Sequence, residues 1–186
     1  MALTESTMAL ELGSTAPDFA LPDVVTGKTL RRDDVRGAKG LLVMFICTHC
    51  PYVKHIEKEL AAMGRDFADK PVRIAAIGSN DALNFPDDSP EGLRRQADAL
   101  GFSFPYLYDE SQAVAKAYRA ACTPDFFLFD SQLRLVYRGE FDASRPGNKV
   151  PVTGAALRTA LEDVIAGRTP SAEQRPSIGC NIKWKA

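Results

Sequence analysis

The stretch 41–53, LLVMFICTHCPYV, holds the features from which the fold is predicted. Residues 41–46 form a short, continuous apolar run, which is typical of a strand buried on both faces of a sheet. The motif C-T-H-C follows at residues 47–50, at the carboxyl end of that strand. Apolar residues then recur with the spacing of one helix face, at Val53, Ile56, Leu60, Met63 and Phe67. The stretch therefore predicts a buried strand leading into a helix over 51–69, with the motif at the junction.

Strand-like and helix-like segments alternate along the rest of the chain. Ser89 followed by Pro90 is typical of a helix start, and Ser111 offers a cap to a further helix. The predicted elements are a β-hairpin within 16–30, strand 41–46, helix 51–69, strand 72–78, helix 89–101, strand 104–108, helix 111–121, strands 126–129 and 133–137, and a closing helix around 157–165. This order indicates an α/β fold in a single domain over 1–186, with a core of about 14–168 and a C-terminal tail over 169–186.

Composition and charge exclude several classes of function. Charged residues make up 25% of the 186 residues and the formal net charge is −1, which leaves no basic field for nucleic acid or an anionic membrane. The first 13 residues carry Glu5 and Glu11 and no long apolar run, unlike a secretory signal. We therefore expect a cytoplasmic protein with no cofactor, no nucleic-acid partner and no membrane partner. The oligomeric state stays open.

The C-T-H-C motif itself predicts thiol chemistry. Two cysteines separated by two residues can close a small disulfide ring, and at a helix start the first sulfur faces unpaired backbone N–H groups and the positive end of the helix dipole. We therefore expect Cys47 to be an exposed nucleophile with a lowered pKa, and Cys50 to be the resolving thiol. His49, with Thr48 beside it, is expected to tune that pKa and the redox potential.

Two other interpretations of the motif stay open. In one the cysteines are inert core residues, and in the other they are half of a metal site. A structural zinc site needs four ligands, and the chain has no second C-x-x-C and no H-x-x-x-H pair. Cys122 and Cys180, or His49 and His55, would have to complete such a site.

The order of elements, the C-x-x-C at the start of the first core helix and Thr123-Pro124 just before a strand together resemble the thioredoxin superfamily. The resemblance implies a thioredoxin-like fold, in which a central mixed β-sheet is flanked by helices. The N-terminal β-hairpin and the C-terminal tail would be extensions of it. The resemblance also implies that Pro124 is a cis-proline packed against the active-site cysteines, so that Thr123 and Pro124 shape a substrate groove.

Longer motifs are similar to the peroxiredoxin-like branch of the alkyl hydroperoxide reductase/thiol-specific antioxidant (AhpC/TSA) family. They are APDFALPD at 16–23, FICTHCPYV at 45–53, CTPDFFLFD at 122–130 and SIGCNIKW at 177–184. True peroxiredoxins carry P-x-x-x-T/S-x-x-C, and counting back from Cys50 puts Cys47 at the Thr position and Val43 at the Pro position. The same count from Cys47 gives Met44 and Gly40. Neither cysteine therefore has the hydroxyl that would help to polarise a peroxide.

Disulfide exchange is accordingly the first interpretation, ahead of peroxide reduction by a peroxiredoxin-like thiol peroxidase and of metal binding by Cys and His. The chain is predicted to be a thiol–disulfide oxidoreductase. Its partners would be protein or small-molecule disulfides and an upstream thiol reductant. Hydroperoxides would be substrates under the second interpretation.

Two further thiols are candidates for auxiliary roles. Cys122 lies two residues before Pro124, within reach of the motif if that loop abuts it, although a free cysteine is commonly a buried structural residue. Cys180 lies in a tail whose Ile182 and Trp184 imply docking onto the body of the protein. We expect Cys180 either to resolve an oxidised motif cysteine or to be a structural thiol.

Overall fold

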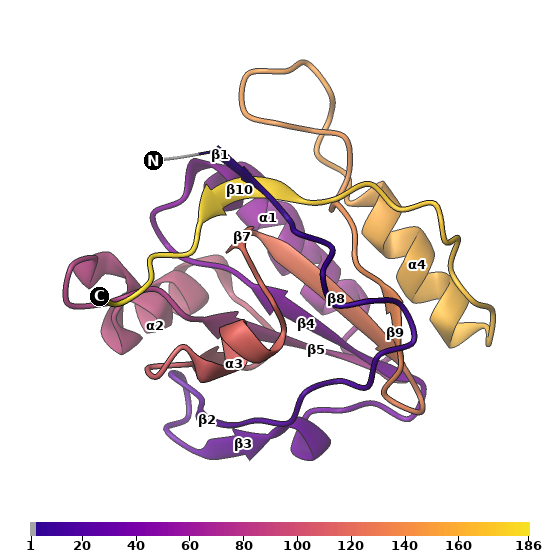
Figure 1. Ribbon diagram of the computed structural model, residues 1–186, viewed down its shortest axis with the longest axis horizontal. Coiled ribbons are helices and arrows are strands. Elements are labelled where there is room, and N and C mark those ends of the chain that lie inside the picture. The colour runs from indigo at the N-terminus through magenta and orange to yellow at the C-terminus, as the bar shows by residue number, and fades with distance from the viewer. Residues whose placement is uncertain (1–2) are drawn as a thin grey trace.

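A five-stranded sheet forms the centre of the fold in the computed structural model, which describes residues 3–186 (Figure 1). Its strands are β4 (Gly40–Phe45), β5 (Val72–Gly78), β6 (Tyr106–Tyr108), β8 (Asp125–Asp130) and β9 (Leu135–Tyr137). Their order in space is β6-β5-β4-β8-β9. The pairs β4–β5 and β5–β6 are parallel, whereas β4–β8 and β8–β9 are antiparallel. The predicted central mixed sheet is thus confirmed.

Helices and a hairpin cover the two faces of this sheet. They are α1 (Pro51–Asp66), α2 (Pro90–Leu100), α3 (Ala113–Ala117), α4 (Ala155–Ile165) and the antiparallel pair β2 (Ala20–Pro22) and β3 (Thr29–Arg31). α1, α2 and α4 pack against one face, with Leu42 and Met44 of β4. α3 and the hairpin pack against the other, with Leu41 and Val43. Because successive side chains of a strand point to opposite faces, the continuous apolar strand β4 supplies both cores.

The boundaries of α2 match their local signals. The Ser89 hydroxyl accepts a hydrogen bond from the Gly92 N–H, and Pro90 takes the first helical position. Gly101 ends the helix at φ 64°, a left-handed conformation that glycine adopts without strain. The prediction of a helix over 89–101 is therefore confirmed.

The helix α3 corrects the prediction of a helix over 111–121 capped by Ser111. Gln112 stands at the N-cap, at φ 63°, and the helix covers only 113–117. The buried Gln112 side chain donates hydrogen bonds to the backbone carbonyls of Ser79 and Lys183. These tertiary hydrogen bonds hold Gln112 outside the helix, and no local pattern signals them.

A second, three-stranded sheet joins both ends of the chain to the body. It consists of β1 (Leu3–Glu5), β10 (Ile178–Asn181) and β7 (Cys122–Thr123), all antiparallel, with β10 in the middle. In Figure 1 the yellow β10 lies beside the indigo β1. The tail expected over 169–186 therefore contains a strand that the sequence analysis did not predict. No helix within residues 3–186 is long and apolar enough to cross a bilayer.

Candidate active site

The C-T-H-C motif occupies the turn from the carboxyl end of β4 to α1. Cys50 is the N-cap residue of α1, and Pro51 takes the first helical position. The loop before β8 meets the motif: the Thr123 hydroxyl oxygen lies 3.2 Å from the Cys47 sulfur, and the Thr123 carbonyl oxygen 3.2 Å from the Cys50 sulfur. The Thr123–Pro124 peptide bond is cis, as the family resemblance implies. The structure thus brings Thr123 into contact with both motif sulfur atoms, and Pro124 follows it through the cis bond.

Both motif cysteines are buried. Cys47 is 1% and Cys50 0% exposed, so the expectation of an exposed Cys47 is wrong for this conformation. The reason is tertiary, because β10 packs against α1 and pairs with β7, and so covers the motif.

The cysteine with the lowered pKa is Cys50. The pKa of Cys50 is lowered to about 5, although burial acts in the opposite direction. The largest cause is a hydrogen bond from the Cys47 thiol; the Cys180 thiol and backbone N–H groups, including that of Val53, add to it. The hydrogen bond to Cys50, burial and the charge of Asp88 raise the pKa of Cys47 well above its ordinary value. The predicted lowering at Cys47 is therefore wrong. The Val53 N–H, in the first turn of α1, acts on the Cys50 sulfur instead.

A buried carboxylate that the sequence analysis did not single out organises the motif loop. Asp88, the last residue of the short helix η2 (Pro86–Asp88), is 1% exposed. It accepts hydrogen bonds from the Thr48 N–H at 2.8 Å, the Thr48 hydroxyl at 2.6 Å and the Asn80 amide at 2.8 Å. The His49 Nδ1 atom lies 2.6 Å from Asp88 Oδ2. Burial would raise the pKa of Asp88, but the hydrogen bonds from these partners lower it, so the carboxylate is charged at neutral pH.

Thr48 and His49 therefore contact a carboxylate instead of the sulfur atoms. The residue of this network that acts on a thiol is Asp88, whose charge raises the pKa of Cys47, and the tuning role of Thr48 and His49 stays a prediction. The sequence holds little sign of this role, since an aspartate just before the Ser89-Pro90 helix start is an ordinary turn residue.

The structure brings together a possible metal-ligand set that differs from those considered from the sequence. Cys47 Sγ, a ring nitrogen of His49 and an Asp88 oxygen lie within 4.8 Å of one another, whereas the sequence analysis considered Cys122 and Cys180, or His49 and His55, as completing ligands. His49 Nδ1 and the Asp88 carboxylate already contact each other. A cation would have to displace that contact.

The two auxiliary thiols differ in position. Cys180 Sγ lies 2.8 Å from Cys50 Sγ, and burial together with Cys50 raises the pKa of Cys180 to about 12. The buried Cys122 sulfur faces the Pro124 carbonyl oxygen at 3.6 Å, and burial strongly raises the pKa of Cys122. All four cysteines are free thiols. The tail cysteine therefore reaches the motif, and Cys122 contacts its own loop.

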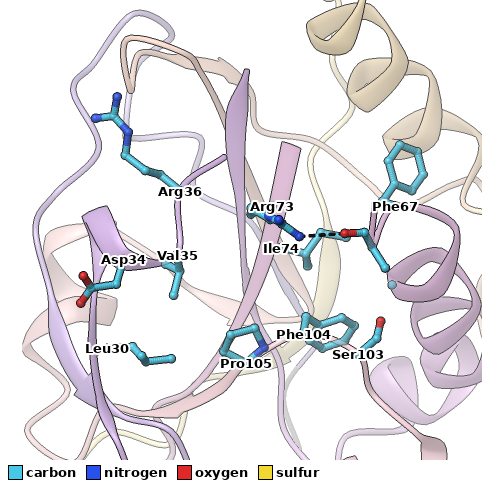
Figure 2. Close-up of a pocket in the computed structure, with 12 residues that line it drawn as sticks. Leu30, Asp34, Val35, Arg36, Phe67, Arg73, Ile74, Ser103, Phe104 and Pro105 are labelled. Atoms are coloured by element: carbon cyan, nitrogen blue, oxygen red, sulfur yellow. Dashed lines mark hydrogen bonds between the residues drawn. The ribbon is translucent and has the colours of Figure 1, made fainter. Parts of the chain in front are cut away.

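Figure 2 shows a cavity of about 420 Å³ that is remote from these thiols. Arg73 and Ile74 of the beginning of β5, and Phe104 and Pro105 just before β6, contribute to its lining, whereas the motif follows the opposite end of the sheet. A second cavity, of about 290 Å³, borders the motif. It is lined by Thr48, Lys54, Glu57, Asp87, Gly92, Arg95 and Gln96.

Comparison with known proteins gives a family and a class of relatives. The AhpC/TSA family model matches residues 12–138. The thiol-disulfide oxidoreductase ResA of Geobacillus thermodenitrificans strain NG80-2 is 34% identical over 131 residues, which are 68% of this chain and 67% of ResA.

Solved structures agree with this fold. The crystal structure of an uncharacterized conserved protein from Geobacillus kaustophilus is 52% identical, with a TM-score of 0.97 over 100% of this chain and 97% of that chain. The thioredoxin domain of a thiol-disulfide oxidoreductase from Bacteroides vulgatus is 18% identical, with a TM-score of 0.61 over 81% of this chain and 98% of that chain. The second likeness shows the fold alone, which is thioredoxin-like as the sequence resemblance implies.

Proposed function

This chain belongs to the AhpC/TSA family, and we propose that it is a thiol–disulfide oxidoreductase whose redox-active pair is Cys47 and Cys50. The observation that carries the proposal is the pair itself. Its two sulfur atoms share a hydrogen bond at the start of α1, directly against the loop of Thr123 and Pro124. A C-x-x-C pair in this position can alternate between dithiol and disulfide. The identity of 34% to ResA supports the same class of reaction.

In the proposed reaction Cys47 attacks one sulfur of a substrate disulfide, after passing its proton to the Cys50 sulfur. A mixed disulfide forms and one substrate sulfur leaves as a thiolate. Cys50 gives that proton to the departing substrate thiolate, attacks the Cys47 sulfur, releases the second substrate sulfur as a thiolate and closes the Cys47–Cys50 disulfide. In the mixed disulfide Cys47 has no proton to donate, so the Cys180 thiol and the backbone N–H of Val53 are the donors that stabilise the Cys50 thiolate for the second step.

The partners proposed for this reaction are protein or small-molecule disulfides and an upstream thiol that reduces the Cys47–Cys50 disulfide. The cavity lined by Thr48, Lys54 and Glu57 borders the motif and supports an approach from that side. A cytoplasmic location stays a prediction from the composition.

Serine variants of the two cysteines test the proposal, with insulin as a disulfide substrate. Cys47→Ser should abolish turnover, because no attacking sulfur remains. Cys50→Ser should accumulate mixed disulfides with the substrate, because nothing resolves them. Cys122→Ser, which changes a buried thiol facing its own loop, is the matched control and should keep wild-type turnover. Full turnover by Cys47→Ser would contradict the assignment.

Peroxide reduction is the second candidate function, and the lowered pKa of Cys50 is the observation that favours it. Cys50 also stands at the peroxidatic position of the peroxiredoxin pattern. Against it, Cys47 replaces the pattern's hydroxyl, and within residues 3–186 no recorded hydrogen bond joins a guanidinium to either motif sulfur. Peroxide consumption with a dimedone-reactive Cys50 sulfenate in Cys47→Ser, and no mixed disulfides in Cys50→Ser, would establish this function instead.

A further inference from the structure

The C-terminal segment 177–183 packs beside the motif, where β10 pairs with β7 and Cys180 contacts Cys50. β10 pairs antiparallel with β7, with Cys180 opposite Thr123 and Asn181 opposite Cys122. An extended peptide adds to an exposed strand edge by the same main-chain hydrogen bonding. The segment therefore takes the place that a substrate polypeptide would take beside Thr123. Its cysteine lies at the centre, with the sulfur 2.8 Å from Cys50 Sγ.

Hydrogen bonds fix the segment on both sides of Cys180. Before it, the Ser177 carbonyl accepts from the Ser6 N–H at 2.8 Å. After it, the Lys183 N–H donates to the Asn80 side-chain oxygen at 2.8 Å. Asn80 also donates to Asp88, so the docked segment and the motif loop share one network. Holding two reacting groups in place in this way raises their effective concentration.

Gly179 allows the backbone of β10 to approach the backbone of Thr123 closely. A Cβ atom at this position would lie 2.0 Å from the Thr123 carbonyl oxygen and 2.6 Å from its carbonyl carbon, both of them backbone atoms. No larger residue fits while β10 stays in register. The glycine thus allows the segment to approach until the sulfur atoms of Cys180 and Cys50 meet.

We propose that Cys180 is a third catalytic thiol, which exchanges with the Cys47–Cys50 disulfide. The Cys180 sulfur attacks Cys50, the Cys50–Cys180 bond forms and the Cys47–Cys50 bond breaks. Cys47 leaves as a thiolate and takes up the proton that Cys180 loses. One disulfide replaces another, so no oxidant or reductant is consumed. The two sulfur atoms, 2.8 Å apart, need to approach by only about 0.8 Å to reach the ~2.05 Å of a disulfide.

The exchange rests on the proposed function, because the Cys47–Cys50 disulfide is its starting point. Its consequence is that the oxidised protein regains a free Cys47 while the tail is bound covalently at Cys50. The segment then acts as an internal substrate and stays paired with the strand edge at Thr123. Reduction of the Cys50–Cys180 bond would release it.

Disulfide mapping of the full chain tests this proposal. The protein is oxidised with glutathione disulfide, its free thiols are alkylated after denaturation, and the linked peptides are identified by mass spectrometry. The wild type should contain both Cys47–Cys50 and Cys50–Cys180 links, with Cys47 alkylated in the second form. Cys47→Ser should form the Cys50–Cys180 link in most molecules. Cys122→Ser should match the wild type.

A second variant keeps every thiol and changes only the docking. Gly179→Ala should lower the yield of the Cys50–Cys180 link at least tenfold and leave the Cys47–Cys50 disulfide in its place. Gly101→Ala is the control for backbone strain, since Gly101 has a positive φ of 64° and nothing within 4 Å of its added Cβ. An unchanged link in Gly179→Ala would overturn the proposal. So would a Cys47→Ser protein in which Cys50 stays glutathionylated and Cys180 stays free.

The two proposals can fail separately. If both links form but the wild type does not turn over insulin, the exchange at Cys180 stands and the proposed function fails. If insulin is turned over, no Cys50–Cys180 link forms and Cys180→Ser keeps wild-type turnover, the proposed function stands and the exchange fails.

Discussion

Cys47 and Cys50 carry the same side chain, and their surroundings make them different. Cys50 stands at the N-cap of α1 and receives hydrogen bonds from two thiols and from backbone N–H groups. Cys47, one turn earlier, lies near the charged Asp88 and donates to Cys50. A thiolate is therefore favoured on one sulfur and disfavoured on the other, although C-x-x-C is symmetric as a pattern.

The hydrogen bond from Cys47 is the largest cause of the lowered pKa of Cys50, and its removal should be measurable. In Cys47→Ala we expect the pKa of Cys50 to rise from about 5 by about 1–2, because a hydrogen bond to a charged group contributes ~1.5–3 kcal/mol. Thiolate absorbance against pH measures this value. Cys47→Ser keeps a donor and should stay close to the wild type. Equal pKa values in both variants would show that the donor is unimportant.

Asp88 should contribute both to stability and to the thiols. Asp88→Asn removes a buried charge that accepts from Thr48, Asn80 and His49, and we expect a loss of about 1–3 kcal/mol in the free energy of unfolding at pH 7. Because the pKa of Asp88 is lowered in the folded state, its contribution is present above the unfolded pKa and is lost as pH falls through the folded one.

Urea unfolding of the wild type and Asp88→Asn at pH 7 and near pH 3 measures this contribution. The difference between the two proteins should shrink at the lower pH. Asp87→Asn, one position earlier and outside the hydrogen bonds of the Thr48 N–H and Asn80, is the matched control. A difference that grows toward low pH would contradict the charged state assigned to Asp88.

At the scale of elements, each helix or strand next to the motif positions one residue of the candidate site. β4 ends at the motif, α1 begins at Cys50, and the short helix η2 carries Asp88. η2 leads directly into α2 through Ser89, whose hydroxyl caps the helix. β7 and the cis bond at Pro124 bring Thr123 to the sulfur atoms. The site is thus assembled from the ends of elements, where backbone N–H groups and turns are available.

The cap of α2 should stabilise the fold without taking part in the chemistry. Ser89→Ala leaves the Gly92 N–H without its side-chain acceptor, and we expect a cost of about 1 kcal/mol in unfolding free energy, with turnover of insulin unchanged. Denaturant unfolding measures the cost. Ser171→Ala, in an exposed position outside any helix, should cost less than half as much. A large loss of turnover in Ser89→Ala would mean that the cap also positions Asp88.

At the scale of the whole molecule, segments near the two ends of the chain pair with each other beside the C-T-H-C motif. β10 lies between β1 and β7, with Cys180 paired to both Leu3 and Thr123. Beyond β10 the chain continues through the buried Ile182, whose N–H donates to the Ala121 carbonyl. The segment that contacts the motif through Cys180 therefore lies outside the region matched by the family model.

In the sequence, Ile182 and Trp184 both suggest that the tail docks onto the body of the protein, but in the structure only Ile182 is buried. Ile182 is 1% exposed, whereas Trp184 is 41% exposed and lies beside Lys116. We expect Ile182→Ala to cost about 2–5 kcal/mol and to speed alkylation of the motif cysteines by iodoacetamide, because the tail undocks more often. Trp184→Ala should change both quantities little. Equal alkylation rates in the wild type and Ile182→Ala would show that the tail does not limit access.

The sequence by itself determined those parts of the protein that local patterns encode. The apolar run 41–46 predicts a strand covered on both faces, the spacing from Val53 onward predicts α1, and Ser89 with Gly101 marks α2. Each signal arises within about four residues, from side-chain period or from capping. The family motifs added the thioredoxin-like fold and the cis-proline, both confirmed.

Only the tertiary structure decided which sulfur holds the thiolate and what surrounds it. Asp88, whose charge raises the pKa of Cys47, and Cys180, whose thiol helps to lower the pKa of Cys50, both lie far from the motif in sequence. β1, β7 and β10 are strands of two to four residues, too short to show a period, and they form only by pairing with one another. Their register places the Cys180 sulfur against the Cys50 sulfur. Strand pairing is a long-range interaction, so no local sequence pattern predicts this register.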